Sequence, residues 1–138
     1  MNRFLLDTNV VSELRKPKPH GAVLSWIADL QADQIYLSAV TIGELQTGVQ
    51  LTRRQNPEKA DEIELWVDQL AESSQVLPMD APCFREWARL MNGKTEHLLE
   101  DAMIAATARI HNLTVATRNE KDFKPLGVRV LNPFKTSR

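Results

Sequence analysis

The stretch "RFLLDTNVVSELRKPKP", residues 3–19, decides the fold. Its apolar run at residues 4–6 predicts a short buried strand, and the apolar spacing that follows predicts a helix ended by Pro17. Asp7 stands between these two elements. It could cap the helix, or it could be a partly buried carboxylate that needs a cation. This stretch alone leaves both interpretations open.

Strand-like and helix-like segments alternate along the whole chain. Strands are predicted at residues 4–6, 35–38, 75–79, 113–117 and 128–131, with helical patterns between them. This alternation predicts an α/β fold with a mainly parallel central sheet of about five strands flanked by helices. Because the chain contains no internal repeat, low-complexity tract or linker, residues 1–138 are expected to form a single domain.

The composition excludes several classes of protein. The chain has 138 residues, of which 43% are hydrophobic, so it can bury a core. It contains no apolar run long enough to span a membrane, and its first residues lack the pattern of a signal peptide, so we expect a cytoplasmic protein without a membrane partner. Cys83 is the single cysteine, which excludes an intrachain disulfide and favours a buried structural thiol.

The charge of the chain is unevenly distributed. The net charge is −1, but residues 58–72 hold six acids and one lysine and so carry −5, which leaves +4 on the remainder. The acidic run is typical of a solvated helix face. The mildly basic remainder, with clusters at 15–20 and 53–54, is compatible with a polyanionic partner.

Polar residues follow the ends of several predicted strands. In parallel sheets ligands bind outside the carboxyl ends of the strands, where Asp7, Glu44, Asp101 and Asn119 are expected to meet. Singly, each has an ordinary explanation as a cap, a helix-dipole partner, a solvated acid or a turn residue. Together, three carboxylates without a cation would repel one another, and a hard ion such as Mg²⁺ or Mn²⁺ would relieve that repulsion.

Other chemistries fit the sequence less well. The three histidines are scattered without the spacing of a zinc site, and no GxSxG, Walker A or GxGxxG motif is present. A non-enzymatic receiver-type Mg²⁺ module would need paired acids after the first strand, where Leu6 precedes Asp7, and a DxD phosphatase would need an acid where Asn9 stands. A metal-dependent nuclease fits the acids better, and a DNA nuclease stays open beside an RNA nuclease, because phosphodiester chemistry does not choose the sugar.

The segments "LLDTNVVSEL", "LSAVTIGELQTG", "LEDAMIAATARIHNLTVATRNEKDF" and "GVRVLNP" together resemble PIN-domain endoribonuclease toxins of the VapC and FitB-like type, across residues 4–133. The resemblance implies a PIN-like fold and a Mg²⁺-dependent ribonuclease of a type II toxin–antitoxin system. It also implies a cognate antitoxin, an RNA substrate and a homodimer within a toxin–antitoxin hetero-oligomer. The family's acidic tetrad falls on Asp7, Glu44, Asp101 and Asn119, with Thr8, Asn9, Thr117 and Asp122 as supporting residues. Many relatives have Asp at the position of Asn119, whose amide brings no charge.

The expected mechanism assigns a role to each site residue. Asp7 and Asp101 would hold Mg²⁺ or Mn²⁺, Glu44 would ligate it or deprotonate the attacking water, and Asn119 would complete the shell. The basic residues nearest these positions in sequence are candidates for holding the RNA backbone. They are Arg15, Lys16, Arg118 and Lys121.

Overall fold

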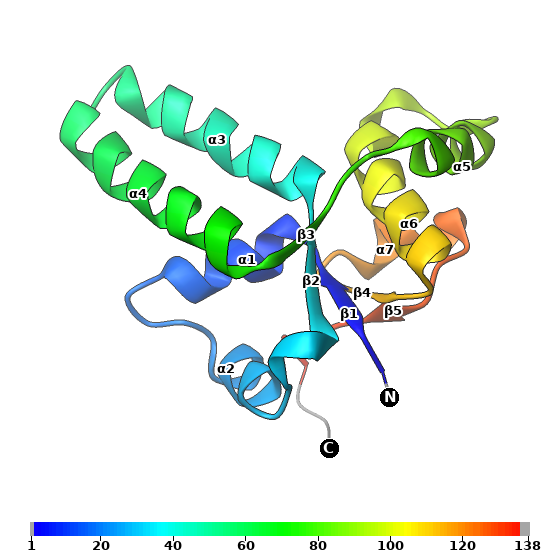
Figure 1. Cartoon of the computed structure of the whole chain (residues 1–138), viewed down its shortest axis with the longest axis horizontal. Coiled ribbons are helices and arrows are strands. Elements are labelled where there is room, and N and C mark those ends of the chain that lie inside the picture. Colours follow the sequence, from blue (N-terminus) through cyan, green and yellow to red (C-terminus); the bar gives the residue numbers. More distant parts are fainter. Residues whose placement is uncertain (1, 136–138) are drawn as a thin grey trace.

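Five short parallel strands form the centre of the molecule, and helices connect them (Figure 1). The computed structural model describes residues 2–135. The strands are β1 Phe4–Leu6, β2 Ile35–Ser38, β3 Gln75–Leu77, β4 Thr114–Ala116 and β5 Val130–Leu131. The helices are α1 Thr8–Arg15, α2 Gly21–Ala28, α3 Ala39–Arg53, α4 Pro57–Ser73, α5 Ala81–Met91, α6 Leu99–His111 and α7 Glu120–Phe123. Single 3₁₀ turns, η1 Ala32–Gln34, η2 Glu96–Leu98 and η3 Lys124–Leu126, precede β2 and α6 and follow α7.

The strand order is β3-β2-β1-β4-β5, and all four pairings are parallel. This confirms the predicted α/β class and the parallel central sheet. The chain builds the sheet outward from β1 to β3 and then returns to add β4 and β5 on the other side of β1. The order therefore reverses between β1 and β4, which makes their carboxyl ends the topological switch point where ligands bind in such sheets.

The run at residues 4–6 is continuously apolar because both faces of β1 are buried. Leu5 packs into one core cluster with α6 residues such as Ile104 and Ala105. Phe4 and Leu6 point to the other face and pack with residues of α1 and α2, including Val10. Successive side chains of a strand point to opposite faces, so the three residues of β1 pack against helices on both faces of the sheet.

Helices α3 and α4 form an antiparallel pair that extends away from the sheet (Figure 1). Asn56 accepts a hydrogen bond from the Lys59 amide, and Pro57 follows at the first helical position, as the sequence predicts. The contact between the two helices is a small core cluster of Val49, Ala60 and Val67. Part of the acidic face of α4 is neutralised from α3, because Arg53 forms ion pairs with Asp61 and Glu64.

Some predicted boundaries are wrong in detail. The predicted strand at 128–131 is reduced to Val130–Leu131, because β4 pairs with it only through Val115 and Ala116. The strand at 75–79 ends at Leu77, before Pro78. In α2, Leu24 is 44% exposed, whereas Val23 beside it is buried. The prediction for Cys83 is confirmed, since the thiol is free and buried.

Within residues 2–135, no helix combines the length and the apolar character that crossing a membrane requires.

Candidate functional site

Asp7 lies at the carboxyl end of β1 and is only 5% exposed. Its carboxylate accepts three hydrogen bonds, from the Thr8 amide at 2.8 Å, the Asn9 side-chain amide at 3.1 Å and the Thr117 hydroxyl at 2.8 Å. The bond from Thr8 caps α1, so the capping interpretation is correct in part. The other two bonds go beyond what a cap needs, and the bond from Thr117 fixes the carboxylate from β4, across the switch point. Burial raises the pKa of Asp7, and the Thr117 hydrogen bond opposes that rise.

Glu44 lies in the second turn of α3 and is joined to the Asp7 region by one hydroxyl group. Thr8 Oγ1 donates to Glu44 Oε1 at 2.7 Å and lies 3.1 Å from the hydroxyl oxygen of Thr41. Burial is the largest cause that raises the pKa of Glu44 to about 7, and the neighbouring carboxyl group of Glu100 is the next. The negative charges of Glu100 and Asp7 raise it further, which shows that these acids are close enough to interact.

Asp101 lies in the first turn of α6, where the helix N-terminus favours negative charge. Burial is the largest cause that raises its pKa to about 6, and the charge of Asp7 is the next. The charges of Asp122 and Glu100 add to this rise. Asp7 therefore interacts electrostatically with both Glu44 and Asp101, and the three acids form one cluster.

Asn119 is exposed and lies at the side of this cluster. Its backbone amide donates to Thr117 Oγ1 at 2.9 Å, and its side-chain amide donates to Asp122 Oδ2 at 2.7 Å. Thr117 thus positions both Asp7 and the start of α7. The Asn119 side chain is engaged with Asp122, one of the predicted supporting residues, and it makes no capping hydrogen bond of its own to α7.

The four predicted RNA-binding residues lie in two groups, at the end of α1 and around the start of α7. Lys16 and Arg118 both pair with Glu13, at 2.9 and 3.4 Å, and the guanidinium of Arg118 lies 4.0 Å from the centroid of the Phe134 ring. Arg15 and Lys121 are exposed. The backbone amide of Arg118 also donates to Asn9 Oδ1, which brings this group next to Asp7.

Three polar residues in and around the site are absent from the sequence prediction. Glu100 acts on both Glu44 and Asp101, and Thr41 contacts the hydroxyl of Thr8. Glu13 is buried, and the hydrogen bond from Lys16 is the largest cause that lowers its pKa. Glu100 directly precedes Asp101 in the motif "LLEDAM", so a second acid in the same helical turn is the signal that could have identified it.

The residues of the cluster suit a hard divalent ion in their chemistry. Carboxylate and amide oxygens are the ligands that Mg²⁺ prefers. Burial raises the pKa values of Asp7, Glu44 and Asp101, and neighbouring carboxylates raise those of Glu44 and Asp101 further, so a cation here would stabilise the charged forms. In residues 2–135, however, no three Asp, Glu, His or Cys side chains are placed so that they could hold an ion as they stand. The donor set fits such an ion in charge and atom type, and binding requires its carboxylates to turn toward one another.

The chain is similar to known proteins in sequence and in fold. The chain is 37% identical to Toxin FitB of Neisseria gonorrhoeae over 138 residues, covering 95% of this chain and 98% of that protein. It is 38% identical to VapC ribonuclease Y4jK of Sinorhizobium fredii, covering 96% and 98%. A solved structure of FitAB bound to an IR36 DNA fragment superposes with a TM-score of 0.85 at 34% identity, covering 98% of each chain. The PIN domain family model matches residues 4–127, and the chain belongs to the PIN-domain family.

Proposed function

We propose that this chain is a metal-dependent endoribonuclease, the toxin of a type II toxin–antitoxin system, and that it hydrolyses RNA phosphodiester bonds in the cytoplasm. The observation that carries the proposal is the cluster at the switch point, where Asp7 is fixed from β4 and its charge acts on Glu44 and Asp101. The names of its relatives support the proposal, since one is called a toxin and another a VapC ribonuclease.

In this proposal Asp7 and Asp101 hold the divalent ion, and Glu44 is a third ligand or the base. When bound, Mg²⁺ or Mn²⁺ would polarise a phosphoryl oxygen and lower the pKa of a coordinated water. Thr117 and Asn9 keep the Asp7 carboxylate in position through their hydrogen bonds. Binding of the ion would remove the repulsion within the cluster, which is the reason for placing three acids there.

Glu44 is suited to accept a proton from the attacking water. Its pKa of about 7 lies near neutral pH, which is where a general base works best. The Thr8 hydroxyl orients one of its oxygens at 2.7 Å. Because Thr8 follows Asp7 directly in the chain, the same turn positions a proposed metal ligand and the proposed base.

Asn119 would complete the site through its carbonyl oxygen, because its side-chain nitrogen donates to Asp122. Arg118 and Lys121 flank Asn119 in sequence, and Arg15 and Lys16 end α1. These four side chains would contact RNA phosphates beside the acids. Phosphate contacts of this kind position a strand without reading its sequence.

The proposed protein partner is a cognate antitoxin that covers the acids with an Arg or Lys. A cation supplied by a partner would relieve the same carboxylate repulsion as the metal, so the two would exclude each other. The proposal includes a homodimer of this chain within a toxin–antitoxin hetero-oligomer. The FitAB relative was solved with DNA, and such an assembly of this chain could likewise bind DNA.

The substrate class is tested by incubating the purified chain with matched RNA and DNA oligonucleotides and with total cellular RNA, in Mg²⁺ and in EDTA. We expect cleavage of RNA in Mg²⁺ only, with discrete mapped ends. Cleavage of DNA alone would favour the competing DNA nuclease, and cleavage that persists in EDTA would contradict the mechanism. Mapped ends from total RNA also identify the RNA that is cut.

The toxin role is tested in cells. Expression of the chain without a partner should arrest growth, and Asp7→Asn should relieve the arrest because it removes a charge from the proposed metal site. Continued arrest by a soluble, folded Asp7→Asn protein would count against the role of Asp7. A co-purified antitoxin that leaves the nuclease rate unchanged at saturation would contradict the inhibitory partner.

A further inference from the structure

Glu13 is a buried carboxylate that has no part in the proposed cleavage chemistry. It lies in the last turn of α1 and is 5% exposed. One of its oxygens accepts a hydrogen bond from the His20 backbone amide at 2.9 Å. The other oxygen pairs with Lys16 Nζ at 2.9 Å and with Arg118 Nη2 at 3.4 Å. The first oxygen therefore ties the loop after α1 to the helix, and the second faces two basic side chains.

Arg118 is held by contacts on several sides. Its guanidinium carbon lies 4.0 Å from the centroid of the Phe134 ring. That ring packs edge-on against the His20 ring, with 5.5 Å between the centroids and an angle of 70° between the planes. The Arg118 side chain is nevertheless 55% exposed. The guanidinium is therefore fixed by the protein and still open to solvent.

This guanidinium lies near the acids but does not reach them. The Arg118 backbone amide donates to Asn9 Oδ1 at 3.2 Å, and the amide of Asn9 donates to Asp7 Oδ2 at 3.1 Å. The Arg118 side chain, however, extends to Glu13, which is six positions after Asp7 on α1 and thus about 9 Å further along the helix axis. Its ion pair uses one of five N–H groups, so donors remain for a phosphate further along a bound strand.

A buried acid beside basic residues needs an explanation if the ligand is RNA. By charge alone, Glu13 would repel a phosphate and weaken its binding. An exposed arginine, on the other hand, loses rotamer freedom when it binds a phosphate, and an arginine that is already ordered loses less. The position of Glu13 under Arg118 is explained if this gain in order outweighs the repulsion.

We propose that Glu13 is a positioning residue for RNA binding, which holds the Arg118 guanidinium on the Phe134 ring as a contact for a phosphate along the strand from the cleaved bond. The inference rests on the proposed function, since it takes RNA as the ligand. A role of Glu13 in the fold alone, through His20, would leave RNA binding unchanged when the ion pair is removed. A pure charge effect would make RNA binding tighter.

The test is Glu13→Gln, because glutamine keeps a carbonyl oxygen for the His20 amide and removes the charge that faces Arg118. Binding of a fluorescein-labelled single-stranded RNA of mixed sequence to the full chain is measured by anisotropy in EDTA, so that the RNA is not cut. We expect the affinity to fall about threefold to tenfold, the cost of ordering one long side chain. In Mg²⁺, KM should rise by a similar factor while kcat stays within about twofold of the wild type.

A double variant shows whether Glu13 acts through Arg118. Arg118→Gln should weaken RNA binding and lower the slope of log affinity against log salt by about one, because one phosphate contact is lost. Glu13→Gln added to Arg118→Gln should cause no further loss, because the group that Glu13 positions is already absent.

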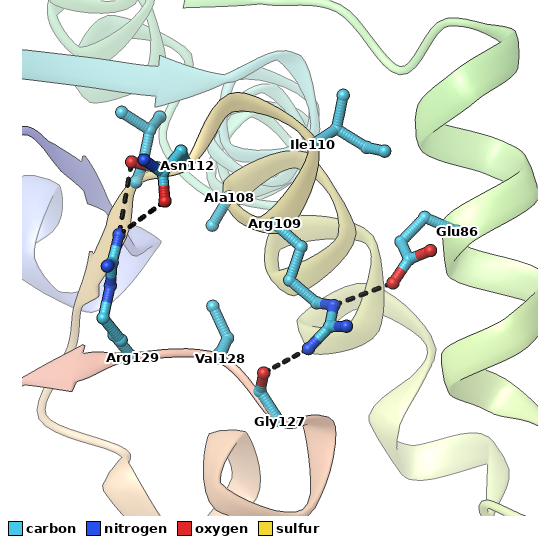
Figure 2. A pocket seen from close by; sticks show the side chains of 9 residues that line it. Glu86, Ala108, Arg109, Ile110, Asn112, Gly127, Val128 and Arg129 are labelled. Atoms are coloured by element: carbon cyan, nitrogen blue, oxygen red, sulfur yellow. Dashed lines mark hydrogen bonds and ion pairs between the residues drawn. The ribbon is translucent and has the colours of Figure 1, made fainter.

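Glu86→Gln is the matched control. The Glu86 side chain is 13% exposed and pairs with Arg109 at 2.7 Å and with Arg89 at 2.9 Å. It lines a pocket of about 390 Å³ beside the end of α6, whereas Asp101 is in the first turn of that helix (Figure 2). Glu86→Gln thus removes the same charge and two similar ion pairs away from the acids, and it should leave the RNA affinity unchanged.

Circular dichroism reports the folding of each variant. If Glu13→Gln does not fold, Glu13→Asp replaces it, because it keeps the net charge and shortens the side chain. It should weaken RNA binding to a similar extent, and an unchanged affinity would contradict the proposal.

Four results would overturn the proposal. They are a wild type that does not bind the RNA, a folded Glu13→Gln chain that binds RNA as tightly as the wild type or more tightly, a further loss in the double variant, and an equal loss in Glu86→Gln. A wild type that binds RNA in EDTA but does not cut it in Mg²⁺ would contradict the proposed nuclease function alone.

Discussion

At the scale of single residues, the Thr117 hydroxyl is the group on which the position of Asp7 depends. It donates to Asp7 Oδ2 at 2.8 Å and accepts from the Asn119 amide at 2.9 Å. The hydroxyl also accepts from the Asn9 side-chain amide at 3.2 Å. Thr117→Val keeps the shape of the side chain and removes all three interactions, so we expect RNA cleavage to slow by about tenfold to a hundredfold. Thr117→Ser, which keeps a hydroxyl, should retain most of the activity. Steady-state kinetics of the two variants check this, and a wild-type rate in Thr117→Val would contradict it.

The pKa of Glu44 predicts a pH dependence of stability. Its value in the folded chain, about 7, lies above the ordinary 4.5, so the folded chain binds more protons than the unfolded chain between these pH values. The free energy of unfolding therefore decreases as the pH rises through this interval. Glu44→Gln removes this loss, and we expect it to stabilise the metal-free chain at pH 8 by about 1 kcal/mol, allowing for solvent screening.

Urea unfolding in EDTA at pH 5 and pH 8 measures this effect. Glu72→Gln, which removes an exposed carboxylate of α4, is the matched control and should change the stability little at either pH. A Glu44→Gln chain that is no more stable than the wild type at pH 8 would show that the charged Glu44 carboxylate does not destabilise the folded chain.

The proposed ligands should differ in importance because they differ in charge. Asp101 brings a negative charge to the cluster, whereas Asn119 brings only a dipole and is exposed. We expect Asp101→Asn to remove nearly all activity, Asn119→Ala to leave a remainder that higher Mg²⁺ or Mn²⁺ recovers, and Asn119→Asp to tighten metal affinity. A metal titration of the cleavage rate checks this order, with circular dichroism as the folding control. Equal inactivity of Asn119→Ala and Asp101→Asn at every metal concentration would assign Asn119 a different role.

Local sequence signals were sufficient to predict some site residues and insufficient for others. Asp7, Thr8 and Asn9 follow a buried strand directly, and their contacts with one another are contacts between chain neighbours. The interaction of Glu100 with Glu44 depends on how α6 lies against α3. The position of Glu100 beside Asp101 is a local signal for a second acid, but no local signal reports its interaction with Glu44.

At the scale of elements, the periodic patterns predicted which helices and strands form better than they predicted where each one ends. The caps at Asn56 and Asp80 each accept a hydrogen bond from an amide three residues further along the chain, so such a helix start depends on local residues. Strand length depends on the partner strand, which the segment itself does not encode. The predicted strand at 128–131 was therefore too long.

The α3–α4 pair provides a test of packing at this scale. Ala60 is fully buried between Val49 and Val67, so Ala60→Leu would force extra methylene groups into a filled contact. We expect a loss of about 1–3 kcal/mol in the free energy of unfolding. Ala71→Leu, at an exposed position of the same helix, is the matched control and should have little effect. Urea unfolding compares the two, and equal stabilities would contradict the assigned packing.

At the scale of the whole molecule, strand order determines which residues meet. The alternation of strands and helices predicted a parallel sheet, but it did not specify the order β3-β2-β1-β4-β5. This order makes β1 and β4 neighbours, so that Thr117 reaches Asp7 across 110 positions of the chain. It also brings residues 108–113 beside residues 127–129, before the amino ends of β4 and β5. These residues line a pocket there, which the sequence patterns did not reveal.

The central claim is that RNA cleavage depends on a divalent ion held by the acids at the carboxyl edge of β1 and β4. The most direct test is the initial rate of RNA cleavage against Mg²⁺ concentration, measured for the wild type and for Asp7→Asn, with EDTA as the zero point. We predict a saturable, Mg²⁺-dependent rate for the wild type and a loss of about a hundredfold or more for Asp7→Asn at every concentration. An equal rate in EDTA, or a folded Asp7→Asn chain with the same Mg²⁺ dependence as the wild type, would contradict the claim.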